Sequence, residues 1–160
     1  MGDRGDPPVA GERAELAGRV RQHVYRWFAD TGRAPSPVEL ARAFELTPSQ
    51  VEHVLEELAT GADALVLLPG SSYIWMAEPF SAVPTSFLVG SGERRWWGNC
   101  IWDALAILAL LDVDGWVATG CPDCGDDLRV EVAAGRLAAG GGVAHFAVPA
   151  RDWWRGIGFT

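Results

Sequence analysis

The sequence has no lysine and no long uninterrupted apolar segment. All 13 basic residues are arginine, a bias that is typical of GC-rich bacterial genomes rather than of a selected chemistry. No stretch approaches the roughly 18 to 20 apolar residues needed to cross a bilayer, and residues 1–15 lack the apolar core of a signal peptide. We therefore expect a soluble cytoplasmic protein with no membrane partner.

Cysteine is also scarce, with three residues in the chain: Cys100, Cys121 and Cys124. An odd number of cysteines in a reducing compartment favours metal-binding, redox or catalytic roles over disulfide bonds. The chemistry should therefore be sought around sulfur.

Positive charge is in deficit, because 21 acidic residues outnumber 13 basic ones and the formal net charge is -8. A negative protein repels phosphate backbones. This balance argues against nucleic acid as the main partner, but it does not identify a ligand.

The 160 residues, 49% of them hydrophobic, suffice for a small helical module and a slightly larger mixed one. Residues 1–11 are rich in glycine, proline and charge, and we expect a disordered tail there. Apolar residues then recur every three or four positions from Glu12 to Ala29, the period of an amphipathic helix ending near Gly32. They are Leu16, Val20, Val24, Trp27 and Phe28.

Two capping-box patterns with proline at the first helical position begin at Ser36 and Thr47, and each predicts a short helix. Residues 64–68 and 73–76 then indicate a hairpin. Three helices and a hairpin over residues 12–78 predict a winged-helix-like module. Its third helix, near residues 48–60, would enter the major groove of DNA in a regulator. That helix carries Glu52, Glu56 and Glu57 and no arginine, which disfavours DNA binding.

Residues 79–85 are expected to form an extended linker to a second domain over residues 86–160. There we expect two strands joined by a turn at residues 90–93, then an apolar helix from about Asn99 to Leu111. Further strands are predicted at Gly115 to Ala118, Leu128 to Ala133 and Val143 to Val148, with a turn at residues 140–142. The predicted fold class is α+β, a winged-helix-like three-helix module followed by a mixed domain of antiparallel strands around an apolar helix.

Cys100 and Asp103 lie at the start of that apolar helix. With Gly98 and Asn99 as the cap, Cys100 would fall in the first turn, where free N–H groups and the helix dipole favour a thiolate. Asp103 is one turn further along the same face. Alternatively, Cys100 is an ordinary buried cysteine and Asp103 a carboxylate that satisfies the helix start.

Residues 97–105, with the sequence WGNCIWDAL, resemble the first catalytic segment of organomercurial (alkylmercury) lyases. The strand and turn before this segment, the turn at Cys121 to Gly125, and residues 143–149 with Asp152 to Trp154 occur in the order seen in that family. An N-terminal winged-helix-like module does too. The resemblance covers most of residues 12–160, but only the Cys-x-x-Asp pattern is specific.

This resemblance implies mercury detoxification by cleavage of a carbon–mercury bond to give a hydrocarbon and Hg(II). Cys100 would capture a small organomercurial substrate, and Asp103 would carry a proton to the departing carbon, since a soft metal needs soft thiolates and the carbanion needs an acid. Mercury is then bound as substrate and product, no cofactor is required, and other thiols accept the Hg(II).

The family's second catalytic cysteine would be expected just after residues 156–160, where this sequence ends. Three explanations remain open: a shortened chain, including a selenocysteine codon read as a stop; a homologue without lyase activity; or a thiolate supplied by Cys121 or Cys124. The Cys121/Cys124 pair resembles half of a zinc knuckle, and one pair alone is only a weak indication of zinc. In the family, a cysteine near Cys121 is regarded as structural.

An alternative function is a non-catalytic thiol metal-binding or metal-sensing protein, with Cys100, Cys121 and Cys124 as the metal ligands. A catalytically inactive structural homologue is a third reading. Trp96, Trp97 and Trp102 could wall an apolar pocket or simply pack in the core. The three histidines have no catalytic setting: His23, His53 and His145.

Overall fold

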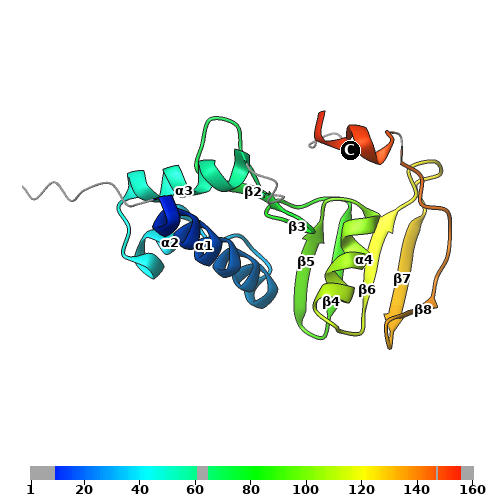
Figure 1. Cartoon of the computed structure of the whole chain (residues 1–160). Helices are drawn as coiled ribbons and strands as arrows, with labels where there is room; N and C mark the ends of the chain where they lie inside the picture. Colours follow the sequence, from blue (N-terminus) through cyan, green and yellow to red (C-terminus); the bar gives the residue numbers. More distant parts are fainter. Residues whose placement is uncertain (1–9, 61–64, 147, 156–160) are drawn as a thin grey trace, which may run out of the picture. The chain divides into compact units, whose positions relative to one another are not determined.

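The computed structural model describes residues 10–60, 65–146 and 148–155, which divide into two compact units. Unit 1 spans Met1–Val83 and unit 2 spans Pro84–Thr160. Helices come first and antiparallel strands dominate afterwards, so the predicted α+β class is confirmed (Figure 1). Within the described ranges, none of the helices is both long and apolar enough to cross a bilayer.

The helices of unit 1 lie where the apolar spacing and the capping boxes predict them. They are α1 (Ala10–Thr31), α2 (Pro37–Phe44) and α3 (Pro48–Thr60), and α1 and α2 both pack on α3. Helix α1 begins at Ala10, two residues earlier than expected, and residues 1–9 of the expected tail lie outside the described residues. The buried side chains of the three helices are Ala17, Val20, Val24, Phe28, Leu40, Val51, Val54, Leu55 and Leu58.

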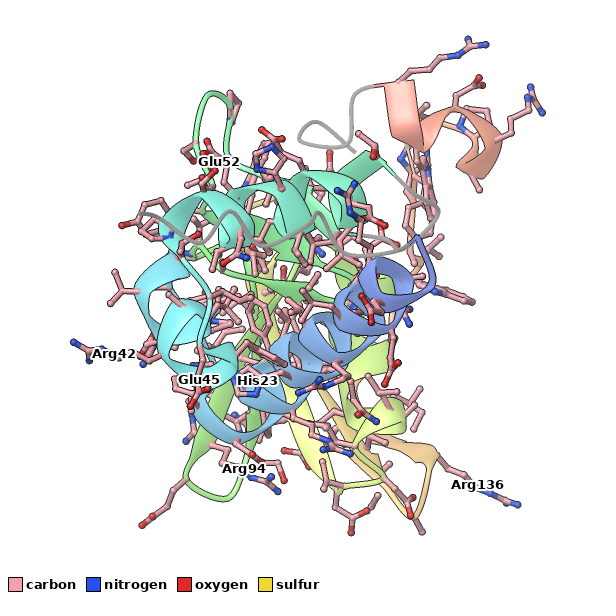
Figure 2. The ribbon with its side chains drawn as sticks, turned by 60° about the vertical axis from the view of Figure 1, so that its left-hand side comes forward. His23, Arg42, Glu45, Glu52, Arg94 and Arg136 are labelled. Atoms are coloured by element: carbon pink, nitrogen blue, oxygen red, sulfur yellow. The ribbon has the colours of Figure 1, made fainter. Side chains whose placement is uncertain are left out.

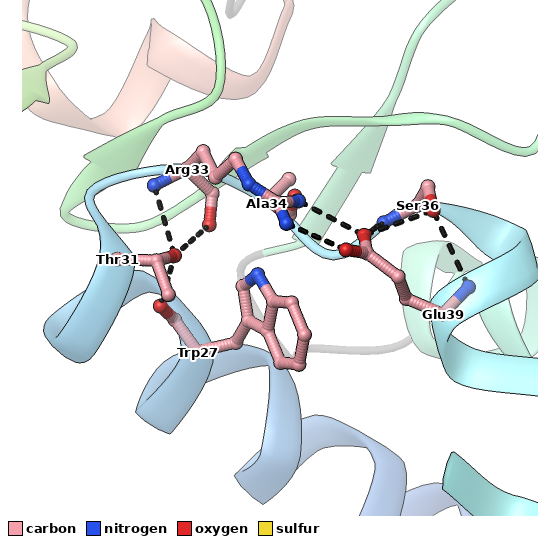
Figure 3. Close-up of polar contacts among 6 residues, drawn as sticks. All are labelled: Trp27, Thr31, Arg33, Ala34, Ser36 and Glu39. Atoms are coloured by element: carbon pink, nitrogen blue, oxygen red, sulfur yellow. Dashed lines mark hydrogen bonds and ion pairs between the residues drawn. The ribbon is translucent and has the colours of Figure 1, made fainter. Parts of the chain in front are cut away.

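The connection between α1 and α2 is fixed by polar contacts (Figure 3). Ser36 caps α2, and its hydroxyl accepts a hydrogen bond from the Glu39 N–H at 3.3 Å, while the Glu39 carboxylate accepts one from the Ser36 N–H at 2.7 Å. The Arg33 guanidinium pairs with that carboxylate (Nη1 to Oε2, 2.9 Å) and lies over the Trp27 ring. These contacts hold the pKa of Glu39 at about 2, mainly through the hydrogen bond from Arg33.

Helix α1 carries His23 (Figure 2), and the His23 ring lies edge-on to Phe44 of α2 at 5.3 Å between centroids. The acidic side chains of α3 expected from the sequence are exposed: Glu52, Glu56 and Glu57. A surface of this sign would meet a phosphate backbone with like charge.

Three short antiparallel strands complete unit 1: β1 (Leu65–Leu67), β2 (Ile74–Ala77) and β3 (Phe80–Ser81). The expected extended linker at 79–85 is therefore corrected in part, since its first residues turn back and pair with β2. Phe80 is 1% exposed and stacks on Phe28 at 5.2 Å, so burial of this ring draws the segment into the core of unit 1.

Unit 2 is an antiparallel sheet with one helix packed on it (Figure 1). Its strands are β4 (Phe87–Ser91), β5 (Arg94–Gly98), β6 (Gly115–Gly120), β7 (Asp127–Ala133) and β8 (Arg136–Ala139), in the spatial order β5-β4-β6-β7-β8. Helix α4 (Ile101–Leu110) packs on β4, β5 and β6. The core between them contains Val89, Trp96, Ala104, Ile107, Leu108 and Val117.

The end of the chain differs from the sequence prediction. Of the strand expected at Val143 to Val148, residues 143–146 and 148 form no strand, and residue 147 lies outside the described residues. Instead, a two-residue turn at Ala134 and Gly135, both with positive φ, reverses the chain so that β8 pairs with β7. The chain then continues to a 3-10 helix, η1 (Ala150–Arg155).

Candidate active site at the start of helix α4

Cys100 is itself the N-cap of α4, one position earlier than the first-turn placement expected from the sequence. Its backbone is extended (φ -145°, ψ -179°), and its Sγ accepts a hydrogen bond from the Asp103 N–H at 3.4 Å. The Cys100 carbonyl accepts the first helical hydrogen bond, from Ala104, at 2.9 Å. The cysteine therefore takes the position that Ser, Thr, Asp or Asn usually occupies, with sulfur as the acceptor.

Gly98, the last residue of β5, allows α4 to approach the sheet. A Cβ at this position would lie 2.6 Å from the backbone nitrogen of Ala104 and 2.8 Å from its Cα. The Gly98 carbonyl also accepts a hydrogen bond from the Thr85 hydroxyl at 2.6 Å. Gly98 and Thr85 thus position the turn that carries Cys100, a role that sequence reasoning missed for both, because it treated Gly98 as part of a helix cap and Thr85 as linker.

The Cys100 thiol is half-buried, and this burial raises its pKa to about 11. The N–H groups of Asp103 and Trp102 act in the opposite direction, while the charge of Asp103 adds to the increase. The expected low-pKa thiolate is therefore corrected: desolvation outweighs the backbone N–H groups at this helix start. At neutral pH Cys100 is therefore a thiol, which would have to release a proton in order to bind a metal.

Asp103 faces that thiol from the first turn of α4. Burial raises the pKa of its carboxyl, whereas the side chains of Asn99 and Cys100 lower it by hydrogen bonding. Both amide atoms of Asn99 are buried and make no hydrogen bond of good geometry. The Cys100 thiol, the Asp103 carboxyl group and the unsatisfied Asn99 amide thus lie together at one helix start. A proton can pass there between sulfur and carboxylate.

Cys121 and Cys124 lie in the turn between β6 and β7. The Cys121 N–H donates to the Asp126 carbonyl at 2.8 Å, and the Gly125 N–H donates to the Cys121 carbonyl at 2.9 Å. The N–H groups of Cys124 and Asp123 and the Cys124 thiol lower the pKa of Cys121. Cys124 is exposed, and its pKa is raised, because the effects of the Cys121 and Asp126 side chains outweigh the backbone hydrogen bond of Asp126 that lowers it.

The described part of the chain contains no group of three His, Cys, Asp or Glu side chains arranged to hold a metal ion. Cys100 and the Cys121/Cys124 pair therefore do not form one three-thiolate site in this structure, whereas Cys100 and Asp103 do lie together. His53 and His145 are exposed. Residues 156–160, after which the resemblance would place a further cysteine, lie outside the described residues.

The tryptophans near the site have different surroundings. Trp96 is 1% exposed and belongs to the core of unit 2, whereas Trp102 on α4 is 65% exposed. Trp97 is half-buried. Core packing therefore accounts for Trp96, and Trp102 offers an open aromatic surface beside Cys100 and Asp103 in sequence.

The sequence and the fold were compared with those of known proteins. Residues 80–158 match the family model of alkylmercury lyase, and this range includes both Cys100 and Asp103. The fold is similar to a crystal structure of the mercury-bound form of MerB2, with 20% sequence identity, a TM-score of 0.58, and coverage of 81% of this chain and 67% of the other. No curated protein matches the chain in sequence. On the family match, residues 80–158 form an alkylmercury-lyase-like domain.

Proposed function

We propose that this protein is an organomercurial lyase that cleaves carbon–mercury bonds by protonolysis, with Cys100 binding the mercury and Asp103 carrying the proton. The observation that supports this most directly is the geometry of the α4 start. Cys100 Sγ lies 3.4 Å from the Asp103 N–H, and the Asp103 carboxyl group interacts with the same thiol. A soft metal ligand and a proton carrier are therefore neighbours in a half-buried setting.

In the proposed reaction, Cys100 replaces the ligand that accompanies the organomercury cation, and its thiol proton passes to the Asp103 carboxylate. The carbon–mercury bond then breaks: its electron pair and the Asp103 proton form the new carbon–hydrogen bond, and Asp103 returns to the carboxylate. The raised pKa of Asp103 favours this exchange, because a carboxyl group of higher pKa accepts the thiol proton more readily. The hydrocarbon leaves, and Hg(II) stays on the Cys100 sulfur.

Hg(II) left on one sulfur needs a second ligand. We propose that a small thiol from solution supplies it and removes the ion. Cys121 or Cys124 is the alternative source, but no described group of three metal-ligating side chains joins them to Cys100.

Release of benzene from phenylmercury, measured with excess small thiol, tests the proposal. We expect release by the unchanged chain and a loss of at least about 100-fold in Asp103→Asn, since acid–base groups contribute about 10²–10⁴-fold. Cys100→Ser should lose at least as much, because it removes the sulfur that binds mercury. Cys121→Ser and Asp123→Asn repeat the same chemical changes in the β6–β7 turn and should retain most of the activity. Equal losses in all four variants would contradict the assignment of Cys100 and Asp103.

A second candidate, a non-catalytic thiol metal-binding or metal-sensing protein, is favoured by one observation: Cys121 and Cys124 share a turn open to solvent. Stoichiometric retention of Hg(II) without benzene release would support that function. A DNA-binding sensor is disfavoured, because the exposed face of α3 is acidic.

A further inference from the structure

We propose that Cys121 and Cys124 form a second site, separate from Cys100, that binds one soft cation such as Hg(II) through two thiolates. The site does not depend on carbon–mercury cleavage. It would serve as an exposed acceptor of thiophilic ions on unit 2.

The turn that carries the pair is already fixed by the sheet. Gly120 and Asp127 form the last pair of the β6–β7 ladder, so only six residues separate the strands. Within them, the Cys121 N–H donates to Asp126 and the Gly125 N–H donates back to Cys121, with Gly125 at φ 77°. Both cysteines are therefore held in a closed turn, and a chelating ion would not have to order a loose loop.

The two sulfurs lie close enough to interact with each other. The backbone N–H groups of Cys124, Asp123 and Gly125 lower the pKa of Cys121, so they would compensate negative charge on its sulfur. Cys121 is half-exposed and Cys124 is exposed, so an ion carried by a small thiol can reach both.

The number of ligands indicates the class of ion. Zinc in a structural site takes four ligands in tetrahedral geometry, whereas the described residues place no third His, Cys, Asp or Glu with this pair in a metal-binding arrangement. Although the Asp126 side chain approaches Cys124, it does not complete such a group. Two thiolates suit a soft ion that is satisfied by two sulfur atoms in line, and Hg(II) has this chemistry.

Loading is a ligand exchange without oxidation or reduction. Hg(II) arrives bound to two small thiolates, and the Cys121 thiolate displaces one of them. Cys124 then forms the second mercury–sulfur bond, and its proton goes to the other small thiolate, which leaves as a thiol. The products are one chelated ion, one free thiolate and one thiol.

The Cys100→Ser variant tests this site, because it leaves Cys121 and Cys124 as the remaining cysteines. The reduced variant is given HgCl₂ with an excess of a monothiol and is studied by native mass spectrometry and by X-ray absorption at the mercury edge. We expect one Hg(II) per chain with two sulfur neighbours. Further replacement of Cys124 by Ser should lower retention by about 10²–10⁴-fold, the advantage of a second linked ligand.

Two controls keep the result interpretable. Circular dichroism checks that each variant is folded, and Cys100→Ala repeats the experiment with a different side chain. No retained Hg(II), retention that survives Cys124→Ser, or coordination by three or four sulfurs shared between chains would each overturn the proposal. Because retention is measured without hydrocarbon release, failure of this site can be distinguished from failure of the lyase activity.

Discussion

At the scale of single residues, Cys100 is governed by competition between burial and the hydrogen bonds at a helix start. Burial dominates, and the nearby Asp103 carboxylate adds to it, so the pKa of the thiol rises to about 11. A thiol with this pKa is about one part in a thousand ionised at pH 8. Deprotonation by Asp103 as the metal binds would remove the need for a free thiolate.

The alkylation rate of Cys100 should therefore increase about tenfold per pH unit from pH 7 to pH 10, because the thiolate is the reacting form. Asp103→Asn should raise the rate at pH 8 by up to about tenfold, since it removes the charge that opposes ionisation. Mass spectrometry after iodoacetamide treatment measures both effects in a Cys121→Ser/Cys124→Ser background. A rate independent of pH above pH 7 would mean that the thiol is already ionised.

Asn99 offers a separate test, because both its amide atoms are buried without a good hydrogen bond. A buried polar group without a hydrogen bond lowers stability, so its removal loses little. We expect Asn99→Ala to change the free energy of unfolding by less than about 1 kcal/mol. The amide lowers the pKa of Asp103. Its loss should raise that pKa and move the acid limb of the benzene-release pH profile to higher pH. Strong destabilisation with an unchanged profile would instead assign Asn99 a structural role.

At the scale of elements, the position of α4 depends on the missing side chain of Gly98. Gly98→Ala would place a Cβ against the backbone of Ala104, and we expect it to lower the free energy of unfolding by about 1–3 kcal/mol. Gly120→Ala on β6 is the matched control, since no heavy atom beyond its adjacent residues lies within 4 Å of its added Cβ. Urea unfolding compares the two. Similar decreases in the free energy of unfolding for the two variants would show that the contact with the Ala104 backbone does not determine stability.

The connection between α1 and α2 gives a pH-dependent test. The pKa of Glu39 is about 2 in the folded protein, chiefly through Arg33, and near 4.3 in an unfolded chain. A lowered folded pKa contributes stability above the unfolded value, which is lost as pH falls toward 2. Glu39→Gln should therefore be less stable than the unchanged chain at pH 7, and the difference should disappear near pH 2. Thermal unfolding across this range measures the difference.

Elements that depend on local sequence were predictable from it. The capping box at Ser36 and the apolar spacing of α1 act between neighbouring residues, and the structure places both as expected. Strands β3 and β8 were missed, because each forms only when a turn returns the chain to a partner. The strand expected at Val143 to Val148 had a suitable alternation but no ladder partner in the described residues.

The same distinction applies to the site. The Cys-x-x-Asp spacing predicted that Cys100 and Asp103 would share a helix start, and the hydrogen bond between them agrees with this. The protonation of Cys100 was not predictable, since it depends on how far the folded chain buries the thiol. Nor was the role of Gly98, which becomes visible only when β5 packs against α4.

At the scale of the whole molecule, the chain divides into two compact units, and each contains its own buried side chains. The core of unit 1 lies among its helices and Phe80, whereas the core of unit 2 lies between α4 and its sheet. Stability in proteins is often distributed over such cooperative units. A local change should therefore act mainly on the unit that contains it.

Paired substitutions test this independence through hydrogen exchange. Ser36→Ala removes the cap of α2 and should cost about 0.5–2 kcal/mol, speeding amide exchange in α1 to α3 while α4 and the strands of unit 2 stay protected. Gly98→Ala should speed amide exchange in α4 and the strands of unit 2 and leave α1 to α3 protected, because its added Cβ contacts α4. Exchange measured by mass spectrometry resolves the two units. Equal acceleration in both units by either substitution would mean that they unfold together, and the Cys100 site would then depend on the stability of the N-terminal helices.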